Sequence, residues 1–218
     1  MALTSFSLAA ADDWANFARY SQENAQVRQL PDSCRRVVFM GNSITQNWNT
    51  EHPGFFKDNG FVCRGISGQT TYNMLSRFRN DVVGLKPQIV VIGAGTNDVA
   101  ENSHPFDLET TAGNIFSMAE IARANGIKVI VTSVLPCESY YWHQHITDIP
   151  EKIKALNARV ERYCNENGIP FVDFYTLMLA PDGKGINPAY CVDGVHPVAD
   201  AYNMLEELIL KTIEPMLQ

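Results

Sequence analysis

Val37-Val38-Phe39-Met40-Gly41-Asn42-Ser43-Ile44 is the stretch that decides how this chain is interpreted. Its four apolar residues are typical of a buried strand, and the Gly, Asn and Ser that follow indicate a turn where the strand ends. In an open parallel sheet, ligands bind at the carboxyl ends of the strands. The hydroxyl of Ser43 is therefore a candidate nucleophile.

Apolar, β-rich runs alternate with amphipathic stretches along the rest of the chain. The apolar runs predict five strands, at residues 36–40, 61–64, 88–92, 128–133 and 170–173. The amphipathic stretches predict helices at residues 13–24, 71–85, 108–125, 150–167 and 198–216. This alternation is typical of a parallel sheet with a helix in each connection between strands.

Five strands with intervening helices predict a three-layer α/β/α sandwich. A flavodoxin-like, five-stranded parallel sheet in the order 2-1-3-4-5 would place strands 1 and 3 side by side at the topological switch point. Ser43 would follow strand 1 and Asn97 would follow strand 3, which is the adjacency that a shared site needs. No Pro/Ser/Gly-rich linker divides the 218 residues, so we expect residues 1–218 to form one domain.

Charge and hydropathy argue against two classes of partner. The formal net charge of −7, with scattered basic residues, argues against nucleic acid. No apolar stretch of the sequence is long enough to span a bilayer. Residues 1–11 are small and apolar but carry no basic residue, so they are interpreted either as a remnant of a signal peptide or as a disordered terminus. We favour a periplasmic or secreted protein, with a cytoplasmic one left open.

The cysteine and histidine patterns predict no metal and no cofactor. The five cysteines lack the spacing of metal ligands, and we expect reduced or buried thiols, with a disulfide that involves Cys137 or Cys191 left open. His143 and His145 are two residues apart, a spacing that converges poorly on one ion. We interpret them as exposed loop residues.

Three further segments supply partners for Ser43: Gly65-Ile66-Ser67-Gly68, Gly95-Thr96-Asn97-Asp98 and Asp193-Gly194-Val195-His196. A serine becomes an effective nucleophile when a histidine takes its proton, and a carboxylate holds that histidine in place. Ser43, Asp193 and His196 are therefore the predicted catalytic residues. The backbone N–H groups of Ser43 and Gly68 and the side-chain amide of Asn97 are the predicted oxyanion hole.

These four segments resemble the sequence blocks of the SGNH hydrolases, also called the GDSL esterase/lipase family. The residues that give that family its name correspond to Ser43, Gly68, Asn97 and His196, and the resemblance runs from about residue 36 to the C-terminal helix. It implies a flavodoxin-like sandwich without a metal, and ester hydrolysis through an acyl-enzyme with the carboxylate at Asp193. One departure is Asn42, where the family usually has aspartate; that residue is not a triad member, so the mechanism should be preserved.

Residues near the expected sheet edge are candidates for substrate binding. An aromatic face can stack on a sugar or pack on an acyl chain. The predicted lining residues are Trp48, Val99, Tyr140, Trp142 and Val195, with burial against the sandwich as the alternative for the two aromatic residues at 140 and 142.

The sequence thus predicts a serine esterase that removes small acyl groups, with acetyl on a carbohydrate or similar polyol as the favoured case. Its partner would be a small-molecule or glycan ester, and a homo-oligomer is left open. Alternatives within the family are lysophospholipases and thioesterases. A non-catalytic flavodoxin-like binding module is the rival from another class, for which Gly93-Ala94-Gly95 is a weak hint, but it would leave Asp193 and His196 without a role. An SGNH domain that binds without cutting, or chemistry at a cysteine thiolate, explains the pattern less well.

Overall fold

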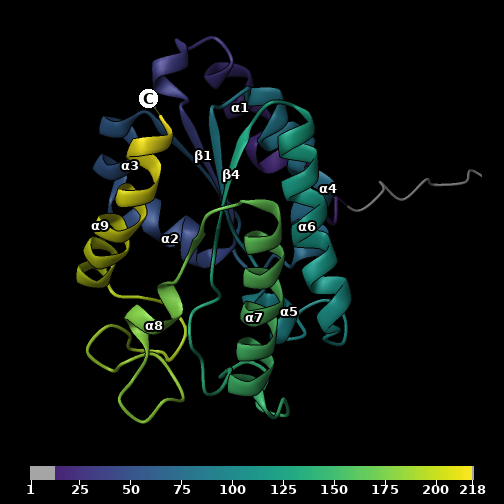
Figure 1. The fold of residues 1–218 in the computed structure, drawn as a ribbon, viewed down its shortest axis with the longest axis vertical. Helices are drawn as coiled ribbons and strands as arrows, with labels where there is room; N and C mark the ends of the chain where they lie inside the picture. Colours follow the sequence, from purple (N-terminus) through teal and green to yellow (C-terminus); the bar gives the residue numbers. More distant parts are fainter. Residues whose placement is uncertain (1–12, 218) are drawn as a thin grey trace, which may run out of the picture.

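A computed structural model describes residues 13–217, so the segment predicted at residues 1–11 lies outside the described residues. Five parallel strands form one sheet in the order β2-β1-β3-β4-β5 (Figure 1). The strands are β1 (Val37–Gly41), β2 (Phe61–Gly65), β3 (Ile89–Gly93), β4 (Lys128–Thr132) and β5 (Phe171–Val172). The predicted fold class and strand order are confirmed.

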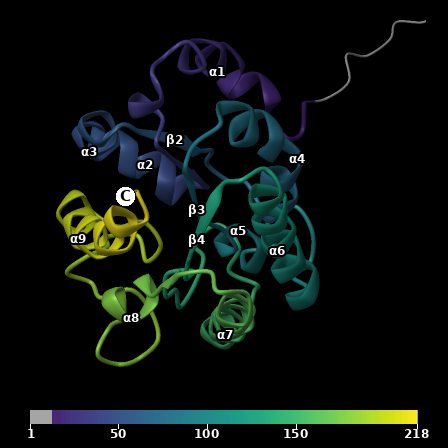
Figure 2. The same ribbon diagram turned by 45° about the horizontal axis from the view of Figure 1, so that its top comes forward.

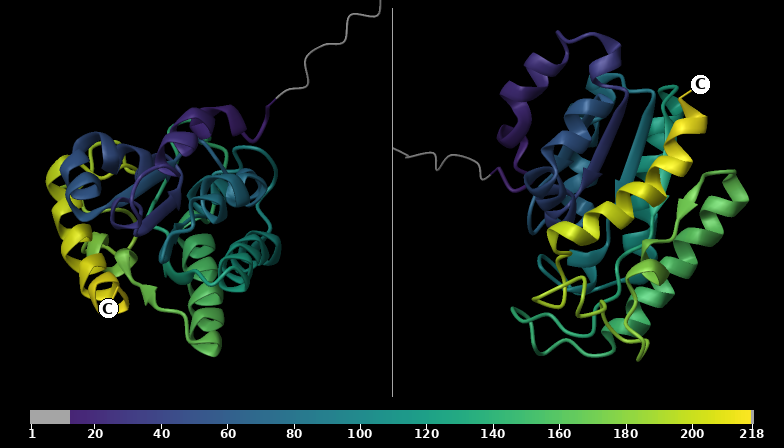
Figure 3. Two further views of the ribbon diagram at one scale, coloured as in Figure 1. Left: turned by 90° about the horizontal axis from the view of Figure 1, so that it is seen from above. Right: turned by 90° about the vertical axis from the view of Figure 1, so that its left-hand side faces the viewer.

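Helices cover both faces of this sheet (Figures 2 and 3). One face carries α4 (Thr71–Asp81), α6 (Leu108–Ala124) and α7 (Ile149–Asn167), with α1 (Ser21–Val27) beside α4. The other face carries α2 (Ser43–Glu51), α3 (Pro53–Asn59), α8 (Phe174–Met178) and α9 (Ala199–Met216). The short helix α5 (Thr96–Val99) follows β3, and three 3₁₀ turns lie at Phe17–Tyr20, Asp32–Cys34 and Val83–Leu85.

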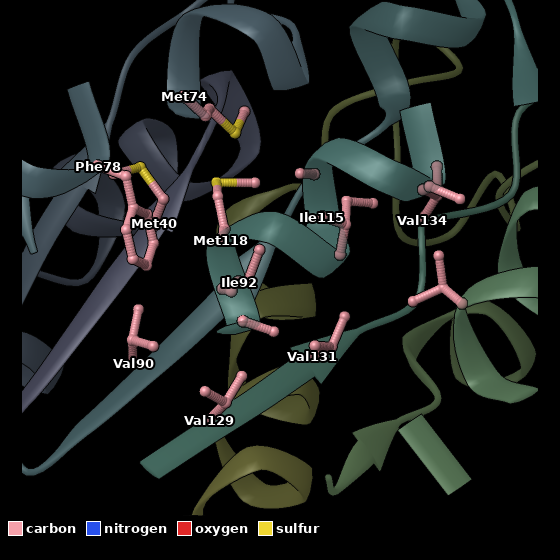
Figure 4. Packing of buried hydrophobic residues seen from close by; sticks show 14 of the residues in the cluster. Met40, Met74, Phe78, Val90, Ile92, Ile115, Met118, Val129, Val131 and Val134 are labelled. Carbon is pink, nitrogen blue, oxygen red and sulfur yellow. The ribbon is translucent and has the colours of Figure 1, made fainter. Parts of the chain in front are cut away.

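The central strands β1 and β3 carry only apolar residues and glycine, because both faces of the sheet are buried there. Aliphatic and sulfur-containing side chains fill the layer beneath α4, α6 and α7 (Figure 4), among them Met40, Val90, Ile92, Met74 and Met118. The opposite layer is aromatic around β1 and β2: Phe39 lies 5.6 Å from Trp48 and 5.3 Å from Phe56, ring centre to ring centre. These aromatic rings pack α2 and α3 against this side of the sheet.

The strand β1 runs almost directly into helix α2. The sequence predicts a turn after this strand but not the helix over residues 43–51 that follows it. Asn42 is the N-cap, and its side-chain oxygen accepts a hydrogen bond from the backbone N–H of Ile44 at 3.0 Å. An aspartate would supply the same oxygen, which explains why Asn42 can stand where the family usually has aspartate.

Three glycines explain how α2 lies so close to the sheet. Gly41, Gly65 and Gly93 end their strands and lie side by side in register. A Cβ at Gly65 would lie 2.3 Å from the backbone nitrogen of Gln46, and one at Gly41 would lie 2.0 Å from the Thr45 hydroxyl. The first turns of α2 therefore rest on bare backbone, and any side chain at these positions would push the helix away.

We expect Gly65→Ala to destabilise the fold by about 2–3 kcal/mol, because the new methyl group meets backbone atoms that cannot rotate away. Urea denaturation measures the change. Gly113→Ala on α6 is the matched control: a Cβ there meets nothing within 4 Å, so it should stabilise the helix by up to about 1 kcal/mol. Equal stability of Gly65→Ala and the unchanged protein would contradict the close packing of α2.

Candidate active site

Ser43 is the first residue of α2, two residues after the end of β1, and so lies at the carboxyl edge of the sheet. Its side chain is almost buried, with 8% of the residue exposed. The Oγ atom lies 2.9 Å from Nε2 of His196, which comes from the segment before α9. Two residues 153 positions apart in the chain are thus joined by one hydrogen bond.

Asp193 holds His196 from the other side. Its Oδ2 lies 2.6 Å from His196 Nδ1, and its Oδ1 accepts hydrogen bonds from the backbone N–H groups of Val195 and His196 at 2.9 and 2.8 Å. Asp193 and His196, three residues apart, are therefore brought together by a turn that the Asp193 carboxylate closes, and not by a helix. Gly194 in this turn has a φ of +82°.

These bonds keep Asp193 ionised. Burial acts to raise its pKa, but the hydrogen bonds from His196 and Val195 outweigh burial and lower the pKa to about 2, from an ordinary 3.8. The ionised carboxylate therefore stabilises the folded state above about pH 4, and this contribution is lost as the pH falls toward 2. At any ordinary assay pH, a negative charge faces the imidazole.

Gly68 lies in an exposed turn after β2 and has a φ of +77°, a region that favours glycine. A Cβ there would meet nothing within 4 Å, so the residue faces open space. The preceding N–H, that of Ser67, donates to Oε1 of Gln46 at 2.9 Å. Helix α2 thus carries Ser43 and also holds the turn that contains Gly68.

Asn97 lies in α5, after β3, and is 3% exposed. Its Nδ2 donates to the backbone oxygen of Gln69 at 2.9 Å, which fixes the plane of the amide while one N–H of the same group is still available to donate. The next residue, Asp98, accepts hydrogen bonds from the backbone N–H and the hydroxyl of Thr71, at 3.0 and 2.6 Å. Asp98 therefore joins α5 to α4, and burial raises its pKa.

A buried arginine lies beneath these turns, although the sequence favours a solvated helix face for the basic pair Arg77 and Arg79. Arg77 of α4 is fully buried and donates to the backbone oxygens of Gly41 and Arg64 at 3.1 and 2.9 Å. It also donates to Oε1 of Gln69 at 2.6 Å and pairs with Asp81 at 2.8 Å. Arg77 thus connects the ends of β1 and β2 to Gln69, whose backbone oxygen orients the amide of Asn97. The available signal was a charge on the apolar face of a predicted helix.

The predicted lining residues need correction. Val99, Tyr140 and Val195 are 0–2% exposed and belong to the hydrophobic core, with the Tyr140 hydroxyl bonded to the oxygen of Thr96 at 3.0 Å. They have no surface to offer a ligand. Trp48 is also buried, although it borders a small cavity that Asn42 and Ile44 also line.

Trp142 is half-buried, and its neighbour Tyr141, which sequence analysis did not list as a lining residue, is 60% exposed. Their rings meet edge to face at 4.7 Å. The aromatic residue that is open to a ligand in this segment is therefore Tyr141. The signal was present in the run of three aromatic residues, but the sequence alone does not say which of them faces outward.

Other features of the described residues bear on chemistry and location. Across residues 13–217, no three His, Cys, Asp or Glu side chains gather to hold a metal ion. The five cysteines, Cys137 and Cys191 included, are free thiols in the structure. Within the same range, no helix combines the length and apolar character that crossing a bilayer requires.

A parallel α/β sheet that carries a hydroxyl, an imidazole and a carboxylate in one hydrogen-bonded chain has the arrangement of a serine hydrolase. Comparisons with known proteins define the class further. The model of the GDSL-like lipase/acylhydrolase family matches residues 39–204. The chain therefore belongs to this family and is a carboxylic ester hydrolase.

Similar solved structures and curated proteins also include acylhydrolases, lipases and esterases. A protein of Bacteroides fragilis NCTC 9343, assigned as an acylhydrolase, is 50% identical with a TM-score of 0.92, over 95% of this chain and 100% of that one. A GDSL-like lipase of Bacteroides thetaiotaomicron VPI-5482 is 53% identical with a TM-score of 0.90, over 93% and 99%. Esterase TesA of Pseudomonas aeruginosa is 27% identical over 82% of this chain and 83% of that protein.

Proposed function

We propose that Ser43, His196 and Asp193 are the catalytic residues of this esterase. The observation that carries the proposal is the continuous chain of contacts from Asp193 through His196 to Ser43, at 2.6 and 2.9 Å. Ser43 Oγ attacks the ester carbonyl carbon while His196 Nε2 takes its proton. Asp193 accepts the hydrogen bond of His196 Nδ1 and stabilises the imidazolium that forms.

The reaction then proceeds in two halves. The tetrahedral intermediate collapses as His196 gives its proton to the leaving alcohol, which leaves the acyl group on Ser43. A water molecule attacks this acyl-enzyme, His196 takes the proton of the water, and collapse returns the proton to Ser43 as the acid departs. The N–H groups of Ser43 and Gly68 and the amide of Asn97 donate to the oxyanion in both halves.

We further propose that the acyl group is small, acetyl being the favoured case. A cavity of about 40 Å³ is lined by Asn42 and Ile44, the two chain neighbours of Ser43, together with Trp48 and Leu205. Ser43 itself is not one of its lining residues, and the proposal is that this cavity takes the acyl group. One water needs roughly 10–15 Å³ measured in this way, so the cavity has room for about three non-hydrogen atoms. An acetyl group fits this volume, and a long acyl chain does not.

A carbohydrate is the proposed leaving group. The exposed ring of Tyr141, next to Trp142, offers an aromatic surface on which a sugar can stack. An acetylxylan esterase of Xylanibacter ruminicola is 24% identical over 82% of this chain, although the match spans only 43% of that longer protein. Both observations support an acetylated polysaccharide or oligosaccharide as substrate.

p-Nitrophenyl esters of graded chain length test the acyl part of this proposal. We expect kcat/KM to be highest for acetate and to fall by about tenfold or more by the octanoate, because the longer chain cannot enter the cavity. Release of acetate from acetylated xylooligosaccharides, compared with release from glycerol triacetate, tests the sugar. An optimum at octanoate or longer would instead favour a lipase or lysophospholipase.

A further inference from the structure

The segment after β4 folds back over the segment that contains Asn97. Three of its side chains bond to residues 96–102: the hydroxyl of Tyr140 to the oxygen of Thr96 at 3.0 Å, Nδ1 of His143 to the oxygen of Ala100 at 2.6 Å, and Nε1 of Trp142 to Oδ1 of Asn102 at 2.9 Å. The first two attach the segment to backbone. The bond from Trp142 is different, because Asn102, which accepts it through Oδ1, also donates a second hydrogen bond through Nδ2.

That other end reaches the turn of Gly68. Nδ2 of Asn102 donates to the backbone oxygen of Gly68 at 3.2 Å, and the backbone N–H of Asn102 donates to the oxygen of Asn97 at 3.1 Å. Asn102 therefore connects two of the three proposed oxyanion donors, Gly68 in the turn after β2 and Asn97 in α5 after β3. The Trp142 N–H, bound to Oδ1, holds the Asn102 amide in the orientation that presents Nδ2 to Gly68.

The peptide unit that carries the N–H of Gly68 joins Ser67 to Gly68, and both neighbouring peptide units are held. The unit before it is held by the bond from Ser67 N–H to Gln46 Oε1, and the unit after it by the bond from Asn102 to the oxygen of Gly68. Gly68 itself is exposed and has no side chain, and a Cβ there would meet nothing within 4 Å. The turn around this unit is closed by a long hydrogen bond, from the N–H of Gln69 to the oxygen of Ile66 at 3.4 Å, so the bond from Asn102 adds a second restraint on the unit.

We propose that Asn102, oriented by Trp142, is a positioning residue that keeps the Gly68 N–H directed at the oxyanion. The inference rests on the proposed function of Gly68 as an oxyanion donor. Without the bond from Asn102, the Ser67–Gly68 peptide unit rotates and its N–H is directed at the oxyanion for only part of the time. Because such a donor acts on the charge that develops in the transition state, the loss falls on kcat and leaves KM nearly unchanged.

Three variants test the proposal on p-nitrophenyl acetate. Asn102→Ala removes the donor, Asn102→Asp keeps the volume and the acceptor for Trp142 but removes the donor, and Trp142→Phe keeps an aromatic ring but removes its N–H. We expect the two Asn102 variants to lower kcat by about 10- to 100-fold, with KM within about threefold of the unchanged protein. Asn165→Asp, at an exposed position near the end of α7, is the control for an added charge and should keep wild-type kcat.

The double variant Asn102→Ala/Trp142→Phe separates positioning from general loosening. If Trp142 acts through Asn102, Trp142→Phe lowers kcat in the single variant but adds nothing to Asn102→Ala. Additive losses, a rise in KM without a fall in kcat, or wild-type kcat in the Asn102 variants would each overturn the proposal.

Ser43→Ala in the same assay separates a failure of the positioning role of Asn102 from a failure of the proposed function. An inactive Ser43→Ala together with wild-type kcat in Asn102→Ala overturns the positioning role alone. A fully active Ser43→Ala overturns the proposed function, and the positioning role with it.

Discussion

Ser43→Ala is expected to lower kcat for p-nitrophenyl acetate by at least about 10⁴-fold while the protein remains folded. The reason is that the Ser43 hydroxyl lies 2.9 Å from His196 Nε2, and no other hydroxyl of residues 13–217 bonds to that nitrogen. The fold should tolerate the change, because α2 is capped by Asn42 and alanine is well suited to the first turn of a helix. Steady-state kinetics and a thermal melt measure the two halves of this expectation.

The control for Ser43→Ala is Ser76→Ala, which removes an exposed hydroxyl bonded only to the backbone oxygen of Tyr72 in α4. It should leave kcat unchanged. Near-wild-type turnover by Ser43→Ala would remove this residue as the nucleophile and favour a different reaction centre. A melting temperature far below that of the unchanged protein would mean that lost structure, and not lost chemistry, explains the result.

Replacement of His196 and of Asp193 should give graded losses. His196→Ala removes the proton acceptor and is expected to lower kcat by about 10⁴-fold or more. Asp193→Ala leaves the imidazole in place without its carboxylate, and we expect a smaller loss, of about 10²- to 10³-fold. Steady-state kcat at pH 8 ranks the variants.

Asp193→Asn provides the sharper comparison with Asp193→Ala. The side-chain oxygen of asparagine can still accept from the N–H groups of Val195 and His196, so the turn is kept, but its amide N–H₂ then faces His196 Nδ1. Two donors cannot pair, so the imidazole is driven to the tautomer that cannot accept the proton of Ser43. Asp193→Asn should therefore lose at least as much activity as Asp193→Ala but less than His196→Ala.

Asp200→Asn, at an exposed position in the first turn of α9, controls for the loss of a negative charge near the site. We expect wild-type kcat from it. If Asp193→Asn were more damaging than His196→Ala, the roles given to the two residues would be wrong. Because the pKa of Asp193 is about 2, none of these comparisons is complicated by protonation of the carboxylate at assay pH.

The sequence predicts the layers and the sheet order because these depend on local patterns. The strands are mostly apolar and each long helix is amphipathic, so their alternation is visible without a structure. The helices α2, α3, α5 and α8 are not predicted, since they are short, and in α2 the apolar residues are few and the start is set by a cap at Asn42. Tertiary packing on bare glycine backbone, and not local propensity, stabilises that helix.

The polar residues of the site also differ in how far the sequence predicts them. The residues proposed to carry the chemistry occur in short, recognisable segments, so Ser43 and His196 could be proposed from the sequence. Residues that hold them in place, such as Gln46 and Arg77, bond to backbone atoms far away in the chain, and nothing in their own neighbourhood marks this. The burial of Tyr140 could not be predicted either, because the exposure of an aromatic residue in a long connection depends on how that connection folds.

The row of glycines at Gly41, Gly65 and Gly93 also indicates where this enzyme can be altered. A side chain at Gly41 or Gly65 would displace α2, so these positions can hardly be substituted, either by natural selection or in engineering a new substrate range. The connections after β4 and β5, at residues 133–148 and 173–198, lie over the same edge and include exposed side chains such as Tyr141. Variation in leaving-group preference should therefore come from these two connections, provided that the contacts of Trp142, Asp193 and His196 are kept.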